Sequence, residues 1–366
     1  MRVLVGMPEK GAWGGPNASE PPIVNELRRL GLTVAEETYI FGSNDSPSLW
    51  IRIKRVVRAA RALERRVKTE SFDIIHLNTY FDFRAVLRDL FTLVFVRPRN
   101  VKVFLKCHGS NATFLATRNV VLRVLSQQLL SRVDGVGLLS VEEKANFVAA
   151  GFAAPKFFIV KNAVEPERFV PDSTFPLPEA KADTPLLLFC ARLVREKGLL
   201  DVIRACKIVR DRGEKFLLMC LGDGPARAEA EAEAARLRLE QETHFCGYVP
   251  EERVAQFYVH STIFVFPTYY QEGLPMVLLN SLAAGVPIIT TRIRGAVDYL
   301  QEPRNCLWVE PRNPVMLAER IGYLLQHAEL RARMIEHNRE LAKGFSPGAA
   351  AGEVLDIYRQ ISQTSR

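Results

Sequence analysis

Short apolar strands alternate with amphipathic helices along this chain, and the alternation starts again halfway. The first half opens with the apolar run Arg2–Met7, which leads through a glycine-containing loop into a helix that ends at Gly31. The second half opens with another apolar run at 185–190, directly after a proline-rich segment from Pro171 to Pro185. Such alternation is typical of parallel sheets with helices on both faces. We therefore predict an α/β protein with two doubly wound domains that face each other across a cleft.

The composition limits the classes of function. The residues are 48% hydrophobic and 25% charged, as in soluble globular proteins, and no segment approaches the ~20 apolar residues of a membrane span. The chain begins with a strand instead of a signal peptide, so we expect a cytoplasmic protein. A net charge of +8 suits anionic partners such as nucleotides or phospholipid headgroups. Because no nucleic-acid-binding motif accompanies the charge, we expect no nucleic-acid partner.

The stretch from Thr262 to Pro287 predicts a strand, a turn and a helix. A β-branched and aromatic run ends at Pro267, and Pro275 then stands in the first turn of a helix, where its missing N–H costs little. Glu272 and the N–H groups of that first turn would meet at the carboxyl edge of a sheet, where α/β proteins bind ligands. A packed turn with a solvated Glu272 explains the pattern equally well.

Two features of the first half are candidates for the same edge of a sheet. Gly14 and Gly15 allow close approach of the backbone to a ligand, although the dinucleotide fingerprint Gly-x-Gly-x-x-Gly is absent. A plain tight turn is the alternative. His108 follows an apolar strand and precedes a Gly-Ser turn, a position that favours a site residue over a buried structural histidine.

Two segments could contact a membrane surface. Residues 49–68 form a predicted helix with apolar residues on one face (Leu49, Ile53, Val56, Ala60, Leu63, Val67) and arginines on the other. A second segment, 91–99, has a very apolar run up to Val96 and then Arg97 and Arg99. A helix with a solvated basic face and an ordinary core segment are the simpler interpretations. Basic clusters gain about 1 kcal/mol per residue near anionic headgroups, which motivates the membrane hypothesis.

Several motifs occur together in a fixed order. They are Asn162-Ala163-Val164-Glu165 with Arg168-Phe169, Ala191-Arg192-Leu193 with Glu196-Lys197-Gly198, Gly222-Asp223-Gly224-Pro225, Glu272-Gly273-Leu274-Pro275, and Ala283-Ala284-Gly285-Val286-Pro287. This series resembles the signature of the family-4 retaining glycosyltransferases, which have the GT-B fold of two Rossmann-like domains. On this basis we place an N-terminal acceptor-side domain at 1–165, completed by a helix at 347–366. A nucleotide-sugar-binding domain would occupy 166–346.

The resemblance implies roles for individual residues. Arg192 and Lys197 would neutralise the diphosphate of the leaving group, Glu272 would bind hydroxyls of the transferred sugar, and His108 would contact the donor sugar near the reacting carbon. The wider set of donor contacts would be Gly14, Gly15, Gly222, Asp223, Gly273, Leu274, Pro275, Met276 and Asn280. We expect no metal or other cofactor, because the chain has no Asp-x-Asp sequence that could hold a divalent cation.

One position departs from the family pattern. The family places a second glutamate eight residues after the first, where it accepts hydrogen bonds from the donor ribose, and this chain has Asn280 there. The amide oxygen can still accept, but the charge-assisted part of the interaction is lost, which should cost donor affinity on the order of 1 kcal/mol.

The preferred hypothesis is a retaining hexosyltransferase of cell-surface polysaccharide synthesis. It would move a sugar from a UDP- or GDP-linked donor to a lipid-linked or saccharide acceptor at the inner face of the membrane. The alternatives are a nucleotide-sugar-binding protein without turnover, because of Asn280, and an epimerase or phosphorylase of the same fold. A nicotinamide-dependent dehydrogenase is disfavoured by the missing dinucleotide fingerprint.

Overall fold

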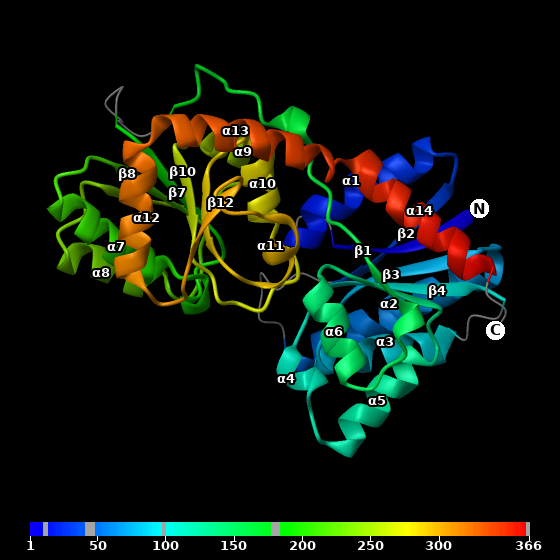
Figure 1. Ribbon diagram of the computed structural model, residues 1–366. Helices are drawn as coiled ribbons and strands as arrows, with labels where there is room; N and C mark the ends of the chain where they lie inside the picture. Colours follow the sequence, from blue (N-terminus) through cyan, green and yellow to red (C-terminus); the bar gives the residue numbers. More distant parts are fainter. Residues whose placement is uncertain (10–13, 41–47, 97–99, 177–183, 364–366) are drawn as a thin grey trace. The chain divides into compact units, whose positions relative to one another are not determined.

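A computed structural model describes residues 1–9, 14–40, 48–96, 100–176 and 184–363 (Figure 1). The chain forms two compact units. Unit 1 consists of Met1–Ala163, Gln271–Leu274 and Pro347–Arg366, and unit 2 of Val164–Tyr270 and Pro275–Ser346. The proline-rich segment from Pro171 to Pro185 thus lies within unit 2, and four residues of the Glu272 turn belong to unit 1.

Unit 1 is built on a parallel sheet of six strands in the order β2-β1-β3-β4-β5-β6. Its strands are β1 (Arg2–Pro8), β2 (Thr33–Ile40), β3 (Ile74–Phe81), β4 (Lys102–Ser110), β5 (Gly135–Leu138) and β6 (Phe157–Ile159). The order reverses between β1 and β3, so the chain leaves the carboxyl ends of these two strands in opposite directions.

Helices cover both faces of this sheet. They are α1 (Gly15–Arg29), α2 (Leu49–Thr69), α3 (Phe83–Val96), α4 (Ala112–Leu115), α5 (Val120–Leu130), α6 (Val141–Ala149) and α14 (Pro347–Gln363), with a single 3-10 turn η1 (Ala154–Lys156). The first and last helices, α1 and α14, pack together on one face, and α2, α3 and α5 lie side by side on the other (Figure 1). Right-handed crossovers require this division, because the chain moves outward from β1 to β2 and then back through β3.

Unit 2 repeats the architecture with the strand order β12-β11-β10-β7-β8-β9. The strands are β7 (Leu186–Cys190), β8 (Leu217–Leu221), β9 (Thr243–Gly247), β10 (Ile263–Phe266), β11 (Ile288–Thr291) and β12 (Cys306–Val309), and all pairs are parallel. Apart from the partly exposed edge strand β9, these strands are almost wholly buried and mostly apolar, as expected for a sheet covered on both faces. The order reverses between β7 and β10.

The helices of unit 2 also form two layers. They are α7 (Leu199–Asp211), α8 (Arg227–Arg236), α9 (Glu251–Val259), α10 (Met276–Ala284), α11 (Arg294–Tyr299), α12 (Pro314–Gln326) and α13 (Ala328–Lys343), with 3-10 turns η2 (Pro166–Arg168) and η3 (Arg195–Lys197). One layer joins α7 to α8 and α12, and the other joins α10 to α9 and α13. The predicted pair of doubly wound parallel sheets is therefore confirmed.

The sequence prediction was wrong or incomplete in three places. It placed only helices after 294, whereas Cys306–Val309 is the edge strand β12, too short to show a period of its own. It also left unassigned β2, which is an edge strand of the unit 1 sheet. The helix at 49–68 is confirmed as α2, but Leu49 and Ile53 are exposed because only the later turns of α2 pack on the sheet. The apolar run 91–96 is the end of α3, and Arg97 and Arg99 lie outside the described residues.

Candidate active site

In unit 2, the loops that follow β7 and β10 meet where the strand order reverses. The β7 loop carries the predicted residues Arg192 and Lys197, and the β10 loop leads toward Glu272. The backbone N–H of Tyr269 donates to the carbonyl of Glu196 over 2.8 Å, which joins the two loops. Gly198 lies so close that a Cβ on it would be 2.6 Å from the carbonyl oxygen of Pro267, so only glycine fits. The fold therefore brings the candidate cations to the ligand-binding edge of the sheet.

The two cations differ in their surroundings. Arg192 is exposed, whereas the side chain of Lys197 is 5% exposed. The ammonium of Lys197 lies 4.9 Å from the ring centre of Tyr270 and 5.3 Å from that of Phe266. The negative faces of aromatic rings attract a cation and help to fix its place. Lys197 is therefore a positioned cation at this edge of the sheet.

The turn at Gly222 packs against the backbone of the loop that carries Arg192. A Cβ on Gly222 would lie 1.9 Å from the carbonyl oxygen of Ala191, and its φ of +120° also favours glycine. The carboxylate of Asp223 accepts from the N–H of Gly224 at 2.7 Å and pairs with Arg227 at 3.2 Å. These contacts assign the turn a role in shaping the loop, and a direct donor contact for Gly222 or Asp223 stays a prediction.

Helix α10 begins one residue later than the sequence predicted, since Pro275 precedes the first turn instead of standing in it. Pro275 is the N-cap residue, Met276 is the first helical residue, and the helix ends at the left-handed Gly285. Asn280, in the middle of the helix, is 5% exposed. It lies beside the hydroxyl of Tyr258. Burial raises the pKa of that hydroxyl far above its usual range. The side chain of Asn280, the residue that replaces the family glutamate, is therefore enclosed within unit 2.

The glycine loop of unit 1 ends at the start of α1. Gly14 is the N-cap residue with φ +133°, a conformation that favours glycine, and Gly15 is the first helical residue. Residues 10–13 of the loop lie outside the described residues. The predicted role of Gly14 and Gly15 in donor contact stays a prediction.

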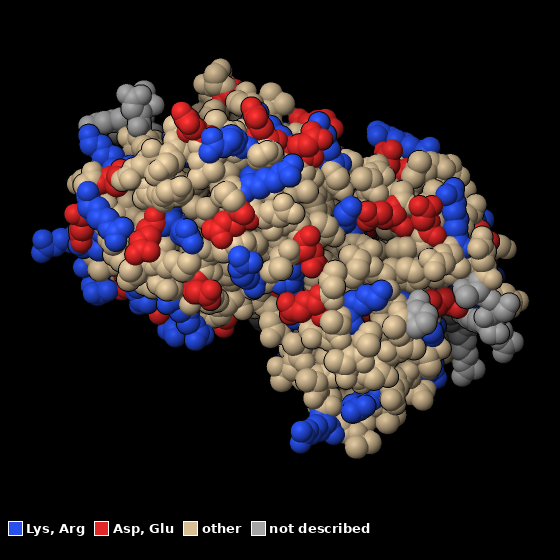
Figure 2. Space-filling model, in the orientation of Figure 1, with Lys and Arg blue, Asp and Glu red and all other residues tan. Residues whose placement is uncertain are grey.

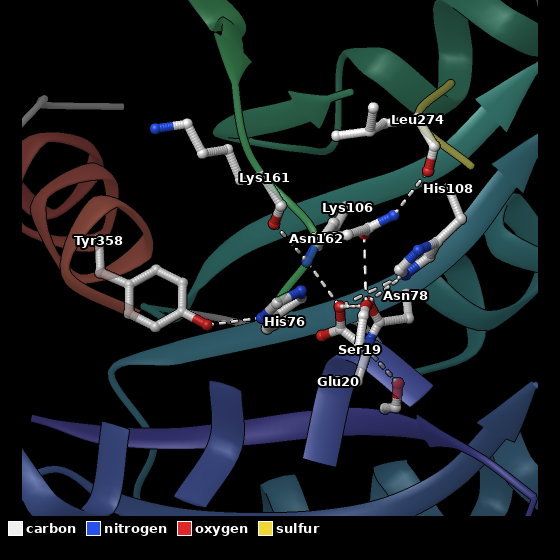
Figure 3. Close-up of polar contacts among 11 residues, drawn as sticks. Ser19, Glu20, His76, Asn78, Lys106, His108, Lys161, Asn162, Leu274 and Tyr358 are labelled. Atoms are coloured by element: carbon white, nitrogen blue, oxygen red, sulfur yellow. Dashed lines mark hydrogen bonds and ion pairs between the residues drawn. The ribbon is translucent and has the colours of Figure 1, made fainter. Parts of the chain in front are cut away.

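Strand alternation gathers polar side chains on one face of the unit 1 sheet. Alternate residues of a strand point to opposite faces. In β3 and β4, one set enters the main apolar core: Ile75, Leu77, Val103, Leu105 and Cys107. The other set presents His76, Asn78, Lys106 and His108 to the face that α1 and α14 cover (Figure 3). Glu20, from the second turn of α1, completes this buried polar cluster.

An ion pair without solvent access lies at the centre of the cluster. The ammonium of Lys106 donates to Glu20 Oε1 over 2.6 Å, and both side chains are fully buried. Burial alone would raise the pKa of Glu20, but the charge of Lys106, with smaller contributions from the two histidines, outweighs burial and lowers that pKa to about 2. Lys106 also donates to the carbonyl of Lys161 at 3.2 Å, which joins the cluster to the last residues of the segment 1–163 of unit 1.

His108 is held neutral in this cluster. Its Nε2 lies 2.9 Å from Asn78 Oδ1 and 3.6 Å from Glu20 Oε1. The Asn78 amide nitrogen donates to the carbonyl of Gly6, so its oxygen is free to accept, and Nε2 of His108 must carry the proton. Burial lowers the pKa of His108 to about 3 against the attraction of Glu20. Nδ1 of His108 is then a buried acceptor, and no partner for it is found among the described residues.

A second histidine closes the other end of the cluster. His76 Nδ1 lies 2.6 Å from the hydroxyl of Tyr358 on α14, and burial lowers the pKa of His76 to about 4 (Figure 3). The rings of His76, Phe104 and Tyr358 also meet edge to face. The C-terminal helix is thereby fixed to the face that holds His108.

The turn with Glu272 is anchored in unit 1. The hydroxyl of Tyr80 donates to the carbonyl of Gln271 at 3.0 Å, and Asn162 Nδ2 donates to the carbonyl of Leu274 at 3.1 Å. Gly273 is buried against Leu139, where a Cβ would come within 2.7 Å of Leu139 Cβ. Sequence reasoning assigned this turn to the second domain. These contacts explain why it belongs to unit 1 instead.

Two family models match the chain in succession. Residues 27–168 match the model described as Glycosyltransferase Family 4, and residues 174–341 match Glycosyl transferases group 1. The chain belongs to the family-4 glycosyltransferases.

Individual relatives agree with this family. The amylovoran biosynthesis glycosyltransferase AmsK of Erwinia amylovora is 27% identical over 187 residues, 50% of this chain and 45% of that protein. The matched part spans about half the length of the curated relatives. The structure of sucrose-phosphate synthase from Thermosynechococcus elongatus matches with a TM-score of 0.81 at 19% identity. The match covers 100% of this chain and 99% of the synthase chain. The structure of Anabaena HepE in complex with UDP-glucose matches with a TM-score of 0.76 at 14% identity. That match covers 98% of this chain and 100% of the HepE chain. These two likenesses show that the chain has the GT-B fold.

Several residues of this family-4 glycosyltransferase were not found by sequence reasoning. The cluster residues Glu20, His76, Asn78 and Lys106 were not predicted as part of a site. A signal for Lys106 was present, because a lysine in an otherwise apolar strand, two residues before His108, must find a buried partner. No sequence pattern identified Glu20 as that partner, 86 residues away.

Proposed function

We propose that this protein is a retaining hexosyltransferase that moves a sugar from a UDP- or GDP-linked donor to a lipid-linked or saccharide acceptor of a cell-surface polysaccharide. The observation that carries the proposal is the pair of loops at the strand reversal of unit 2, where Lys197 is held between Phe266 and Tyr270 with Arg192 on the same loop. Cations at this edge suit a leaving nucleoside diphosphate. Metal independence and retention of configuration are part of the proposal.

The unit 1 residues support roles toward the sugar. His108 offers a buried, unprotonated nitrogen, and a sugar hydroxyl is a donor that would satisfy it. Glu272, in the anchored turn, would accept hydrogen bonds from hydroxyls of the same sugar. With retention, the acceptor hydroxyl attacks from the face that the diphosphate leaves, and the leaving phosphate takes the hydroxyl proton. A relative supports the polysaccharide part of the proposal, since AmsK is named as a glycosyltransferase of amylovoran biosynthesis.

An apolar surface on unit 1 supports a membrane-bound acceptor. Leu49 and Trp50 at the start of α2 are 72% and 73% exposed, and apolar residues in the first turns of two neighbouring helices are exposed as well: Phe83 and Leu87 of α3, and Val120, Val121 and Val124 of α5. Helices that follow parallel strands begin at the carboxyl edge of the sheet, so this apolar surface adjoins the ligand edge. Figure 2 shows few charged side chains over the region of α5 and α6.

The charge of α2 adds to this surface. Its basic residues before the first acidic one, Glu64, are Arg52, Lys54, Arg55, Arg58 and Arg61. Apolar side chains with adjacent basic residues bind anionic membrane surfaces. None of the described helices combines the length and the hydropathy that a bilayer-spanning helix requires.

Thermal unfolding with UDP-, GDP- and ADP-sugars tests donor binding. A ligand at about 100 times its Kd stabilises the protein by about 2.7 kcal/mol, and the matching nucleotide should raise the Tm accordingly. Lys197→Ala should abolish the shift. Lys207→Ala removes a surface lysine that pairs with Asp211, and serves as the control that keeps the shift. If no nucleotide sugar changes the Tm, the donor part of the proposal is wrong.

A second candidate function is nucleotide-sugar binding without turnover, which Asn280 favours because the family glutamate is missing there. Release of nucleoside diphosphate from the matching donor, with and without polysaccharide precursors, separates the two functions. Activity that disappears in Lys197→Ala excludes the second candidate.

Vesicle flotation tests the membrane part. The protein should float with phosphatidylcholine vesicles that contain phosphatidylglycerol and stay below vesicles of phosphatidylcholine alone. Trp50→Ser should weaken flotation, whereas Val315→Ser, which removes an exposed apolar residue from unit 2, should not. Equal flotation of the two variants would contradict the assigned surface.

A further inference from the structure

Asn162 connects the Glu272 turn to the cluster around His108. Its side chain is 3% exposed and uses both amide atoms. Nδ2 donates to the carbonyl of Leu274 at 3.1 Å, and Oδ1 lies 3.3 Å from the hydroxyl of Ser19 (Figure 3). The same hydroxyl lies 3.3 Å from Glu20 Oε1. The single proton of Ser19 is thus shared between two acceptors, Asn162 Oδ1 and Glu20 Oε1, and Ser19 links the residue that anchors the turn to the carboxylate that pairs with Lys106.

The backbone beside Asn162 is held by the same cluster. Lys106, which pairs with Glu20, also donates to the carbonyl of Lys161, the residue before Asn162. Glu20 lies 3.6 Å from His108. A movement of Asn162 would therefore disturb the contacts of both the ion pair and the turn. Buried polar groups that are packed and hydrogen-bonded in this way move together.

Two further anchors hold the turn at its other residues. The N–H of Ala112 donates to Gln271 Oε1 at 3.2 Å, and a Cβ on Gly273 would lie 2.9 Å from Glu143 Oε2. Glu143 is itself buried and accepts from the hydroxyl of Ser110 at 2.7 Å. The turn is therefore seated on unit 1 by hydrogen bonds at both ends and by close packing in the middle. Asn162 is the anchor that the contacts described above link to the His108 cluster.

We propose that Asn162 is a positioning residue that fixes the Glu272 turn relative to His108, so that both side chains meet the same sugar in the geometry that transfer requires. This inference rests on the proposed function. Displacement of a reacting group by about 1 Å can cost about 100-fold in rate. Nucleotide binding depends on Arg192 and Lys197 of unit 2, so loss of Asn162 should lower kcat and leave nucleotide affinity nearly unchanged.

Two readouts on full-length protein test the inference. Amide hydrogen exchange in a peptide that spans Gln271–Leu274 should be at least about tenfold faster in Asn162→Ala and in Asn162→Asp, which keeps the size of the side chain but removes its donor. In both variants kcat should fall by about 100-fold, with the donor KM within about threefold of the wild-type value. Asn338→Ala is the control, since Asn338 is a buried asparagine of unit 2 that donates to the carbonyl of Val286.

The outcomes are distinct. Exchange within twofold of wild type in both Asn162 variants, or an equal acceleration in Asn338→Ala, would overturn the anchoring role. Faster exchange with unchanged kcat would overturn the link to the reaction. If wild-type protein transfers no sugar, the proposed function fails, and the exchange experiment still decides whether Asn162 anchors the turn.

Discussion

Replacement of Lys106 by methionine should destabilise unit 1 strongly and in a pH-dependent way. The substitution leaves Glu20 fully buried without its cation, since the carboxylate and the ammonium are 2.6 Å apart and both are inaccessible to solvent. A pKa held near 2 instead of 4.5 corresponds to about 3 kcal/mol of preference for the ionised carboxylate. Loss of one partner of a buried pair costs about 3–5 kcal/mol in other proteins, so we expect a loss in this range at neutral pH.

The sign of the pH dependence follows from the same pKa. In the wild type, Glu20 has a lowered pKa, so its contribution to stability is present above pH 4.5 and is lost as the pH falls toward 2. In Lys106→Met, burial remains while the main opposing charge is gone, so the pKa of Glu20 rises. Protons then bind the folded variant more readily, at Glu20 or at His76 and His108, whose pKa values Lys106 also lowers. The stability difference between wild type and variant should therefore shrink as the pH falls.

Urea unfolding of a double-mutant cycle measures the effect. Lys106→Met, Glu20→Gln and the double variant should be compared between about pH 5 and pH 8, with tyrosine and tryptophan fluorescence as the signal. The double variant should be more stable than Lys106→Met, because it removes the unpaired charge. Lys68→Met removes a lysine of unit 1 that is 70% exposed in its pair with Glu64, and should cost less than about 1 kcal/mol. Additive effects of the two cluster substitutions, or a penalty independent of pH, would refute the reasoning.

Three further predictions follow from the described contacts. The pKa values of His76 and His108 are lowered from 6.5 to about 4 and about 3, so the free energy of unfolding should fall as the pH drops below 6.5, and His108→Asn should flatten this fall in urea titrations. Gly222→Ala should lower the Tm by several degrees or prevent folding because its Cβ has no room, whereas Gly322→Ala, in open space on α12, should raise the Tm slightly. Asn280→Glu should tighten donor binding by roughly tenfold in calorimetric titrations if position 280 contacts the ribose, and unchanged affinity would show that it does not.

The sequence by itself determined the fold class and where most strands and helices lie. Buried parallel strands are apolar throughout, and the glycines and prolines at their ends mark the turns, so local composition is enough to recognise them. Two of the four edge strands, β2 and β12, escaped prediction. β12 has only four residues, and its pairing with β11 cannot be read from its own sequence. The motifs with Arg192, Lys197 and Glu272 were also readable, because each depends on residues adjacent in the chain.

Only the tertiary structure decided what surrounds those residues. Glu20 and Lys106 are 86 positions apart, and Asn162 and Leu274 are 112 apart, so no local pattern could pair them. The chain order of the Glu272 turn suggested the second domain, yet hydrogen bonds from Tyr80, Ala112 and Asn162 join it to unit 1. A buried polar group must find a partner, but which partner it finds depends on the packing of elements distant in sequence. That packing makes His108 neutral and gives Asn162 its position between the turn and the ion pair.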